Sequence, residues 1–244
     1  MTESDLGKRE AARERQSYVR HELRGSLAVM YPALSLLLDG GAGELTPKQR
    51  EYLEILERSA ERLERLIAGA VDSGWLDCAG AAVEPAAVPL REVFDEVLAV
   101  RRLSGQQGPL IRVEHAPGPR AVAWADREQV RQTAANLLGN AAQYAGGGRP
   151  VRVTLGASAD QTTVLLVVED EGWGIPADEL AHVFDFGFRG VAAREAAPSG
   201  LGIGLWVCRE LVGRNGGSIA IRSEVGAGTT VTVTLPAAGA GGAR

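Results

Sequence analysis

Residues 162–175 read TTVLLVVEDEGWGI, an apolar run that stops at an acidic turn with two glycines. The run over 162–169 has the length and the β-branched content of a strand. Asp170 follows that strand, and Gly172 and Gly174 occupy alternate positions after it. Glycines at such a point let the backbone approach a ligand closely. The stretch therefore predicts a strand that ends in a carboxylate, beside a turn suited to ligand binding.

A second glycine cluster, GLGIGL at residues 200–205, opens a helix predicted over 201–214. Backbone amides at a helix N-terminus attract phosphate, so Gly200, Gly202 and Gly204 indicate a phosphate site. The cluster differs from the dinucleotide fingerprint, because that motif follows the first strand of a parallel βαβ unit. The sequence also contains no Gly-Lys-Ser/Thr of a P-loop.

Two carboxamides, Asn136 and Asn140, lie four residues apart in a helix predicted over 126–144, with Asp126 as its N-cap. At this spacing both side chains lie on one helix face. Mg²⁺ prefers oxygen ligands and keeps several waters, so a side-chain carbonyl aimed at the phosphates of a nucleotide is chemically reasonable. Taken alone, such a pair is more often a solvated or capping pair.

These motifs fall in a predicted α/β sandwich over residues 89–236, with a mixed, largely antiparallel sheet. The last two strands form a hairpin candidate through residues 225–228. A Gly/Ala-rich tail over 237–244 is expected to be disordered. The expected helices cover 90–103, 126–144 and 201–214, and the expected strands cover 110–115, 121–124, 151–155, 162–169, 218–222 and 229–235.

The N-terminal part predicts a helical hairpin over residues 17–75, after a helical lead-in over 1–16 and before a linker over 76–88. Leucines and other apolar residues recur at spacings of three and four on both arms, which are heptad seams. Thr46, Pro47 and Gln49 mark the start of the second arm. Two helices cannot cover two seams alone, so we expect a homodimer with a four-helix bundle. The fold class is α+β.

Composition narrows the function. The chain has 31 glycines among 244 residues, close to twice the roughly 7% of average usage. A net charge of −5 gives no bulk attraction to nucleic acid or anionic membrane. No uncharged stretch reaches the length of a membrane span, and no signal peptide opens the chain. Two distant cysteines suit a reducing compartment, so a cytoplasmic location is expected.

Six motifs in this order resemble sensor histidine kinases over nearly all of residues 17–236. They match the H, N, first glycine, F, second glycine and third glycine boxes of that family. The matching segments are His21-Glu22-Leu23-Arg24, Asn136 to Asn140, Asp170 to Gly174, Phe184 to Arg189, Gly200 to Gly204 and Gly226 to Thr229.

The resemblance implies an ATP- and Mg²⁺-dependent kinase that phosphorylates its own His21 and passes the phosphoryl group to an aspartate of a response-regulator receiver domain. Glu22 matches the acidic neighbour that takes the imidazole proton. Asn140 matches the Mg²⁺ ligand, and Asn136 its phosphate-side companion. Asp170 matches the carboxylate that accepts a hydrogen bond from the adenine amino group.

The remaining boxes are implied to bind the nucleotide as well. The glycines of both clusters and Thr229 belong to this binding set. Arg189 matches an arginine of a mobile lid over residues 176–199 that can offset phosphate charge. Such phosphoryl transfer depends mostly on positioning and charge stabilisation.

Four features depart from the family pattern. Gly25 replaces the Thr or Asn linked to dephosphorylation of the regulator, and Ser26 replaces a proline, so phosphatase activity is not expected. Gln143 replaces a basic residue, and Gly187 an aromatic one. The 20 residues before His21 hold no sensor domain, which implies an upstream sensor partner or a missing sensor domain.

Two other classes stay open at this point. One is a dimeric scaffold with a degraded nucleotide domain that binds receiver domains. The other is a related ATPase or serine kinase of the same superfamily, such as an anti-sigma factor. The heptad hairpin with His21 argues against the second class, and the intact Asn140 and Asp170 argue against the first.

Overall fold

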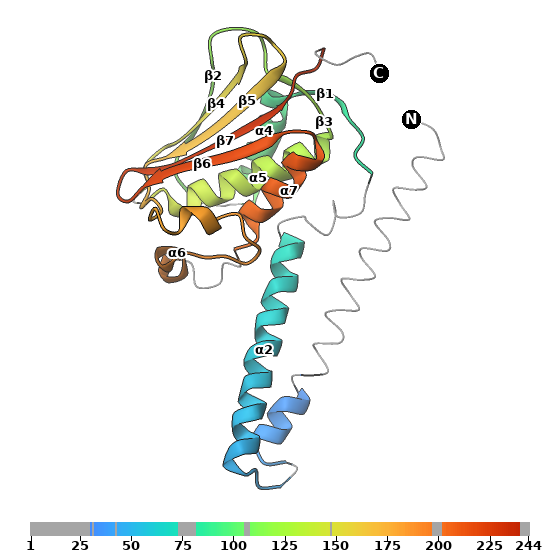
Figure 1. The fold of residues 1–244 in the computed structure, drawn as a ribbon, viewed down its shortest axis with the longest axis vertical. Helices are drawn as coiled ribbons and strands as arrows, with labels where there is room; N and C mark the ends of the chain where they lie inside the picture. The colour runs from blue at the N-terminus through green and yellow to red at the C-terminus, as the bar shows by residue number, and fades with distance from the viewer. Residues whose placement is uncertain are drawn as a thin grey trace. The chain divides into compact units, whose positions relative to one another are not determined.

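A computed structural model describes residues 30, 32–41, 43–72, 82–104, 108–146, 148–196 and 202–239 (Figure 1). The chain divides into two compact units, Met1–Ala81 and Ala82–Arg244. The lead-in over 1–16, His21, Glu22 and Gly25 lie outside the described residues.

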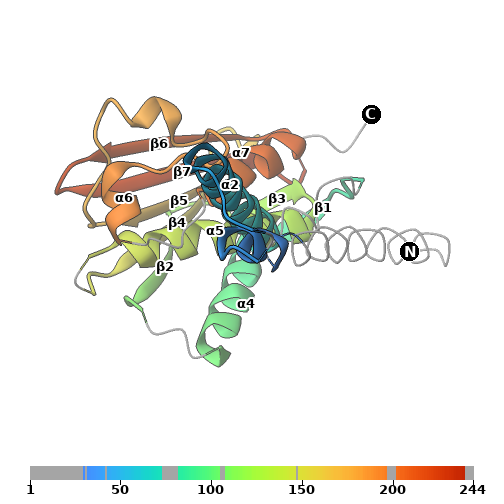
Figure 2. The same ribbon diagram turned by 90° about the horizontal axis from the view of Figure 1, so that it is seen from below.

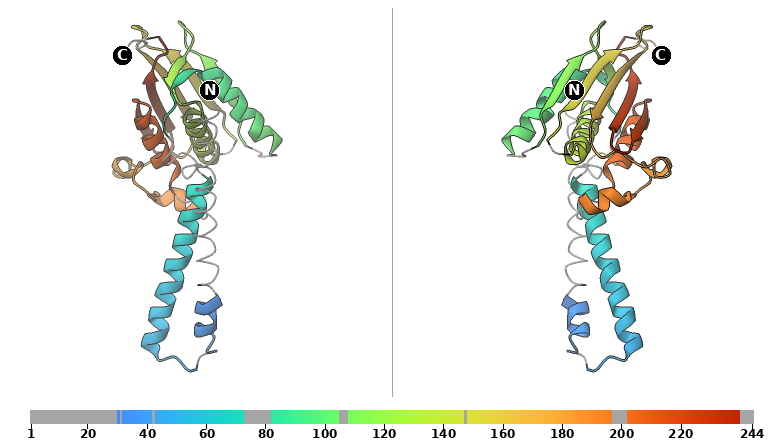
Figure 3. Two further views of the ribbon diagram at one scale, coloured as in Figure 1. Left: turned by 90° about the vertical axis from the view of Figure 1, so that its right-hand side faces the viewer. Right: turned by 90° about the vertical axis from the view of Figure 1, so that its left-hand side faces the viewer.

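The first unit contains a helical segment over residues 32–38 and the long helix α2 (Pro47–Asp72), which lie side by side in Figure 3. α2 begins at the predicted residue. The Gln49 amide donates to Thr46 Oγ1 at 3.3 Å, and the Thr46 amide donates to Gln49 Oε1 at 2.9 Å. This reciprocal pair is a capping box, which satisfies two backbone donors at the helix start.

Among the seam residues whose burial the structure describes, Leu34 on the first arm and Ala60 on α2 are buried. Arg50 Nη1 also donates to the Leu38 carbonyl at 3.4 Å, which joins the two arms near the turn. These contacts confirm a helical hairpin among the described residues. Other apolar side chains of α2 stay exposed, including Tyr52 and Leu56.

The second unit is built on a five-stranded sheet in the order β2-β4-β5-β7-β6, and Figure 2 shows the strands side by side in this order. β2 pairs with β4 in parallel, while the other three pairings are antiparallel. The mixed, largely antiparallel sheet is therefore confirmed. The strands are β2 (Ile111–His115), β4 (Val151–Ala157), β5 (Thr163–Asp170), β6 (Ser218–Glu224) and β7 (Gly228–Pro236).

Three helices cover one face of this sheet: α4 (Leu90–Leu103), α5 (Arg127–Tyr144) and α7 (Gly204–Arg214) (Figures 1 and 3). Alternate strand residues point into the layer between sheet and helices, as the burial of Val164, Leu166 and Val168 on β5 shows. The two layers form the predicted α/β sandwich, and the predicted helices lie within a few residues of the observed ones.

The structure adds elements at both ends of the predicted domain. The last three residues of the predicted linker, 86–88, form β1 (Ala86–Pro89) together with Pro89. β1 pairs antiparallel with β3 (Val122–Ala125), so the second unit begins before the predicted Pro89. At the other end, Ala237 is buried and bridges Ala123, and the Ala238 amide donates to the Val122 carbonyl at 2.8 Å. The prediction of disorder from residue 237 was therefore wrong for the first tail residues, because they extend β7 alongside β3.

Candidate nucleotide site

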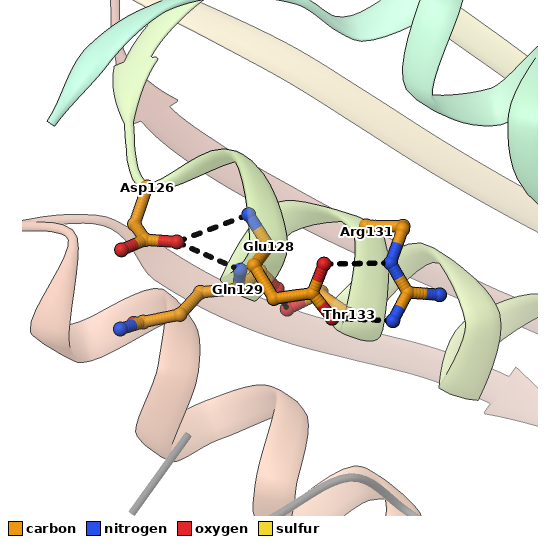
Figure 4. A network of polar contacts seen from close by, with 5 residues as sticks. All are labelled: Asp126, Glu128, Gln129, Arg131 and Thr133. Carbon is orange, nitrogen blue, oxygen red and sulfur yellow. Dashed lines mark hydrogen bonds and ion pairs between the residues drawn. The ribbon is translucent and has the colours of Figure 1, made fainter. Parts of the chain in front are cut away.

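α5 carries the two predicted asparagines, and its start is determined by Asp126. The Asp126 carboxylate accepts hydrogen bonds from the amides of Glu128 at 3.0 Å and Gln129 at 3.1 Å (Figure 4). This confirms the predicted N-cap, which satisfies two of the orphan donors at the helix start. From there Asn136 and Asn140 lie on the side of α5 that packs against α7.

Asn140 lies directly beside the first residue of α7. A Cβ on Gly204 would lie 3.5 Å from Asn140 Nδ2 and 3.6 Å from Asn140 Oδ1. The N box and the second glycine box, which are 64 positions apart, therefore meet at the N-terminus of one helix. Backbone amides at that terminus lack intrahelical acceptors, so the place is suited to an anion next to a carboxamide oxygen.

Gly202 forms the turn that leads into α7, and its backbone requires glycine. Its φ is +68°, and a Cβ there would lie 2.1 Å from the Phe188 carbonyl oxygen. The turn therefore packs directly on the end of the F box. Gly200, the third predicted glycine of this cluster, lies outside the described residues.

Asp170 is the last residue of β5, one residue beyond the predicted end of the strand, and is half-buried opposite Thr229 on β7. Its Oδ1 accepts a hydrogen bond from the Gly172 amide at 2.9 Å, and the Thr229 amide also donates to it. Burial raises the pKa of Asp170, while these two hydrogen bonds oppose the shift. A half-buried carboxylate with unused lone pairs can accept a hydrogen bond from a ligand amino group.

The first glycine box is held between α5 and the β6–β7 hairpin. A Cβ on Gly172 would lie 1.9 Å from the Tyr144 carbonyl oxygen, and one on Gly174 would lie 1.9 Å from the Glu224 carbonyl oxygen. Close approach to protein backbone therefore accounts for both glycines by itself. Their contact with a ligand stays a prediction.

Thr229 belongs to a small hydroxyl network at the same end of the sheet. Its Oγ1 lies 2.9 Å from Ser223 Oγ, which donates to the Gly228 carbonyl at 2.8 Å and accepts from the Ile175 amide at 2.8 Å. Ser223 thus joins β6 to the first glycine box. Sequence reasoning missed it, because a serine in an exposed-looking strand carries no signal of its own.

The side chain of Arg189 joins the predicted lid to the end of α5. Its side chain hydrogen-bonds to the Tyr144 hydroxyl and donates to the Ala193 carbonyl. Burial raises the pKa of Tyr144, and the Arg189 charge opposes that shift. Tyr144 was also missed, although it follows Asn140 by one helical turn and so lies on the same helix face.

The described part of the predicted lid, residues 176–196, consists of successive turns, the short helix η1 (Leu180–His182) and α6 (Val191–Ala196). Glu179 Oε1 accepts from the Val191 amide at 3.0 Å and so joins the two helices. Gly187, which departs from the family pattern, has a φ of +74°. That left-handed conformation explains glycine in place of an aromatic residue.

Metal binding would rest on few protein ligands here. Within the described ranges there is no group of three or more His, Cys, Asp or Glu side chains that could hold a metal ion. Asn140 supplies one oxygen donor, which suits an ion that keeps most of its waters and binds phosphates.

Among the described residues there is also no helix of sufficient length and hydropathy to cross a bilayer.

Comparisons with known protein families agree with this geometry. The model of the "Histidine kinase-, DNA gyrase B-, and HSP90-like ATPase" domain matches residues 125–239. The model of the "His Kinase A (phospho-acceptor) domain" matches residues 11–78. The class of the second unit is therefore an ATP-binding domain of the gyrase and histidine kinase type.

Individual relatives include a sensor protein and a sensor histidine kinase. Sensor protein SrrB of Staphylococcus aureus (strain NCTC 8325 / PS 47) is 28% identical over 220 residues, which are 89% of this chain and 37% of SrrB. Mycobacterial sensor histidine kinase MprB matches 63% of this chain and 96% of its own, with 28% identity and a TM-score of 0.51. Full-length ShkA in complex with AMPPNP matches 91% of this chain and 45% of its own, with 24% identity and a TM-score of 0.58, which supports the fold.

The chain therefore contains a phospho-acceptor domain and an ATP-binding domain of the histidine kinase type, and it is homologous to sensor histidine kinases. It spans little more than a third of the length of the curated relative described above.

Proposed function

We propose that this protein is an ATP-dependent protein-histidine kinase of a two-component system. One observation carries the proposal: α5 contacts the turn after Asp170 through Tyr144 and contacts the start of α7 through Asn140, one helical turn apart. The carboxylate, the carboxamide and the free amides of a helix terminus therefore gather at one end of the domain. These are the groups that a base, a metal-bound phosphate and a phosphate chain require.

The residues fit Mg²⁺-ATP in the following way. Asp170 accepts a hydrogen bond from the adenine amino group, and the amides near Gly202 and Gly204 bind phosphates. Asn140 supplies the Mg²⁺ ligand, with Asn136 on the phosphate side. Arg189 offsets phosphate charge from the lid.

His21 is the proposed phosphoacceptor. Its imidazole nitrogen attacks the γ-phosphorus of ATP, the bond to the β,γ-bridging oxygen breaks, and ADP leaves. The attacking nitrogen is the unprotonated one of a neutral imidazole, and Glu22 accepts the proton from the other nitrogen, which neutralises the ring as the N–P bond forms. The phosphoryl group then passes to an aspartate of a response-regulator receiver domain. Gly25 lacks the polar side chain linked to the reverse reaction on the regulator, so we propose a kinase with little phosphatase activity.

The proposed assembly is a homodimer in the cytoplasm. Tyr52, Ile55 and Leu56 on α2 are each about half exposed, at 55%, 46% and 51%. An uncovered apolar side of this kind favours pairing with a second copy. Cys208 is a buried free thiol, in keeping with a reducing compartment. A signal would come from a sensor partner or sensor domain upstream.

The test is incubation with γ-labelled ATP and Mg²⁺, followed by acid and base treatment of the labelled protein. We expect acid-labile label that is lost in His21→Ala and in Asn140→Ala. Asn140→Ala should retain adenosine binding, because Asp170 lies on a different element. An acid-stable label would instead indicate a serine kinase. No label on folded wild-type protein would indicate a scaffold and contradict the proposal.

A further inference from the structure

α5 and α7 run antiparallel, and three pairs of side-chain positions mark the register of their contact. At one end Asn140 lies beside Gly204, and at the other end the Asn215 side-chain amide donates to Gln129 Oε1 at 3.0 Å. Eleven residues separate the two positions on each helix. At about 1.5 Å per residue, both spans are about 16 Å, so the two contacts form together only in one register.

A third pair lies between these ends in the same register. Cys208 hydrogen-bonds to the side chain of Asn136, and its thiol donates to the Thr133 carbonyl at 3.8 Å. Cys208 precedes Asn215 by seven residues, and Asn136 follows Gln129 by seven. Both asparagines of the predicted nucleotide site therefore belong to the stripe of α5 that contacts α7.

The pair at the far end is polar and almost fully buried. Gln129 is 2% exposed and Asn215 is 8% exposed. Besides its bond to Gln129, Asn215 donates to the Leu211 carbonyl at 2.8 Å and accepts from the Asp126 amide at 2.7 Å. Buried polar groups of this kind are costly to leave unpaired, so the pair penalises any shift of α7 along α5.

Asp126, which bonds to Asn215, also binds the segment that enters the second unit. The Glu84 amide donates to Asp126 Oδ2 at 3.1 Å, while the carboxylate caps α5. Asp126 therefore joins the entering chain, α5 and, through its own amide, the end of α7. The contacts lie at the opposite end of both helices from Asn140 and Gly204.

We infer that Asn215 is a positioning residue for the phosphate half of the nucleotide site. Its hydrogen bonds set the register of α7 against α5 and thereby the position of the Gly202–Gly204 turn relative to Asn136 and Asn140. The base half is independent of this register, because Asp170 lies on β5 and is held by Gly172 and Thr229. The inference rests on the proposed ATP site, and it assigns Asn215 no contact with the nucleotide.

The test compares two ligands that share the base and differ in the phosphates. Affinities of the full chain for Mg²⁺-ATP and for adenosine are measured by calorimetry in wild type and in Asn215→Leu, at a temperature where circular dichroism shows both folded. We expect ATP affinity to fall about tenfold, while adenosine affinity changes less than about twofold, since small displacements in such sites have large effects on the groups concerned. If Asn215→Leu does not fold, the same two affinities are measured in Asn215→Ser instead.

The control is Val97→Ala, which shortens a buried side chain of α4 outside the three pairs. It destabilises the domain without changing the α5–α7 register, so the ratio of the two affinities should stay at the wild-type value. An unchanged ratio in folded Asn215→Leu, or an equal loss for both ligands, overturns the inference and leaves the proposed function intact. Wild-type protein that binds neither ligand would remove the proposed function and the inference with it.

Discussion

Gly204 brings the start of α7 into contact with Asn140: a methyl group at Gly204 would lie 3.5 Å from Asn140 Nδ2, at an ordinary van der Waals distance. Residue 204 has no side chain, so the space beside the carboxamide at this helix terminus is open, and a Cβ would fit there at contact distance. Gly202, two positions earlier, has no such room, since its α-carbon faces the Phe188 carbonyl. Glycine is therefore present at these two positions of one motif for different physical reasons: close backbone packing at residue 202, and open space beside Asn140 at residue 204.

Substitution at these positions should separate the two reasons. Gly202→Ala combines a left-handed backbone with overpacking and should lower the free energy of unfolding by about 3 kcal/mol. Gly204→Ala should leave the free energy of unfolding within about 1 kcal/mol of wild type and weaken ATP binding. Chemical denaturation and calorimetry measure the two effects. Equal destabilisation by both variants would contradict the geometry.

Asp170→Asn should change the pH dependence of stability. Because burial raises the folded-state pKa of Asp170, the protonated form is favoured in the folded state. The stabilisation from this group is full below the unfolded pKa of about 3.8 and is lost as pH rises through the higher folded value. Asp170→Asn removes this loss, so the free energy of unfolding of the variant should increase relative to that of wild type between pH 3 and pH 7. Denaturant titration at each pH measures this difference. ATP binding should be lost in the same variant; a stability difference independent of pH would refute the role of burial.

The Arg189–Tyr144 hydrogen bond should restrain the lid. Tyr144→Phe removes the hydroxyl and keeps the ring, so Arg189 loses its hydrogen bond to α5 while its lid-internal bond to the Ala193 carbonyl stays. We expect trypsin to cleave after Arg189 and Arg194 a few times faster than in wild type, with the global free energy of unfolding lower by about 1 kcal/mol. Cleavage after Arg58, in the first unit, is the internal control and should not change.

Cys208 should be unreactive in the folded protein. Burial raises its pKa far above the ordinary range, and the thiolate is the reactive form. In a Cys78→Ser background, a thiol reagent at neutral pH should label Cys208 only after denaturant is added. Rapid labelling of the folded protein would show that the α5–α7 contact opens readily.

The Thr46 side chain should contribute to the stability of the α2 start through its hydroxyl. Thr46→Ala removes the acceptor for the Gln49 amide and should destabilise the helical hairpin by about 1 kcal/mol, as measured by hydrogen exchange of the first amides of α2. Thr46→Ser keeps the hydroxyl and serves as the matched control. Equal exchange in both variants would show that the box adds nothing to the helix start.

Local signals in the sequence were enough to predict most of the helices and strands and most of their ends. Thr46 and Asp126 are caps whose partners lie two or three residues away, so their effect is contained in a short window of sequence. Alternating apolar residues likewise predicted β5 and the β6–β7 hairpin. The order of the motifs then indicated the family. β1 escaped prediction because its short sequence becomes a strand only by pairing with β3.

By itself the sequence determined the three sheet-covering helices, most of the strands and which side chains are available for nucleotide chemistry. Only the tertiary structure decided how those groups meet. Asn215 and Gln129 are 86 positions apart, and the sequence around either residue does not indicate that the two side chains pair. Their pairing, and with it the approach of Gly204 to Asn140, arises because α5 and α7 share one buried register on the sheet. The caps of a helix are set by residues at its own ends, but its register against a neighbouring helix depends on contacts that exist only after folding.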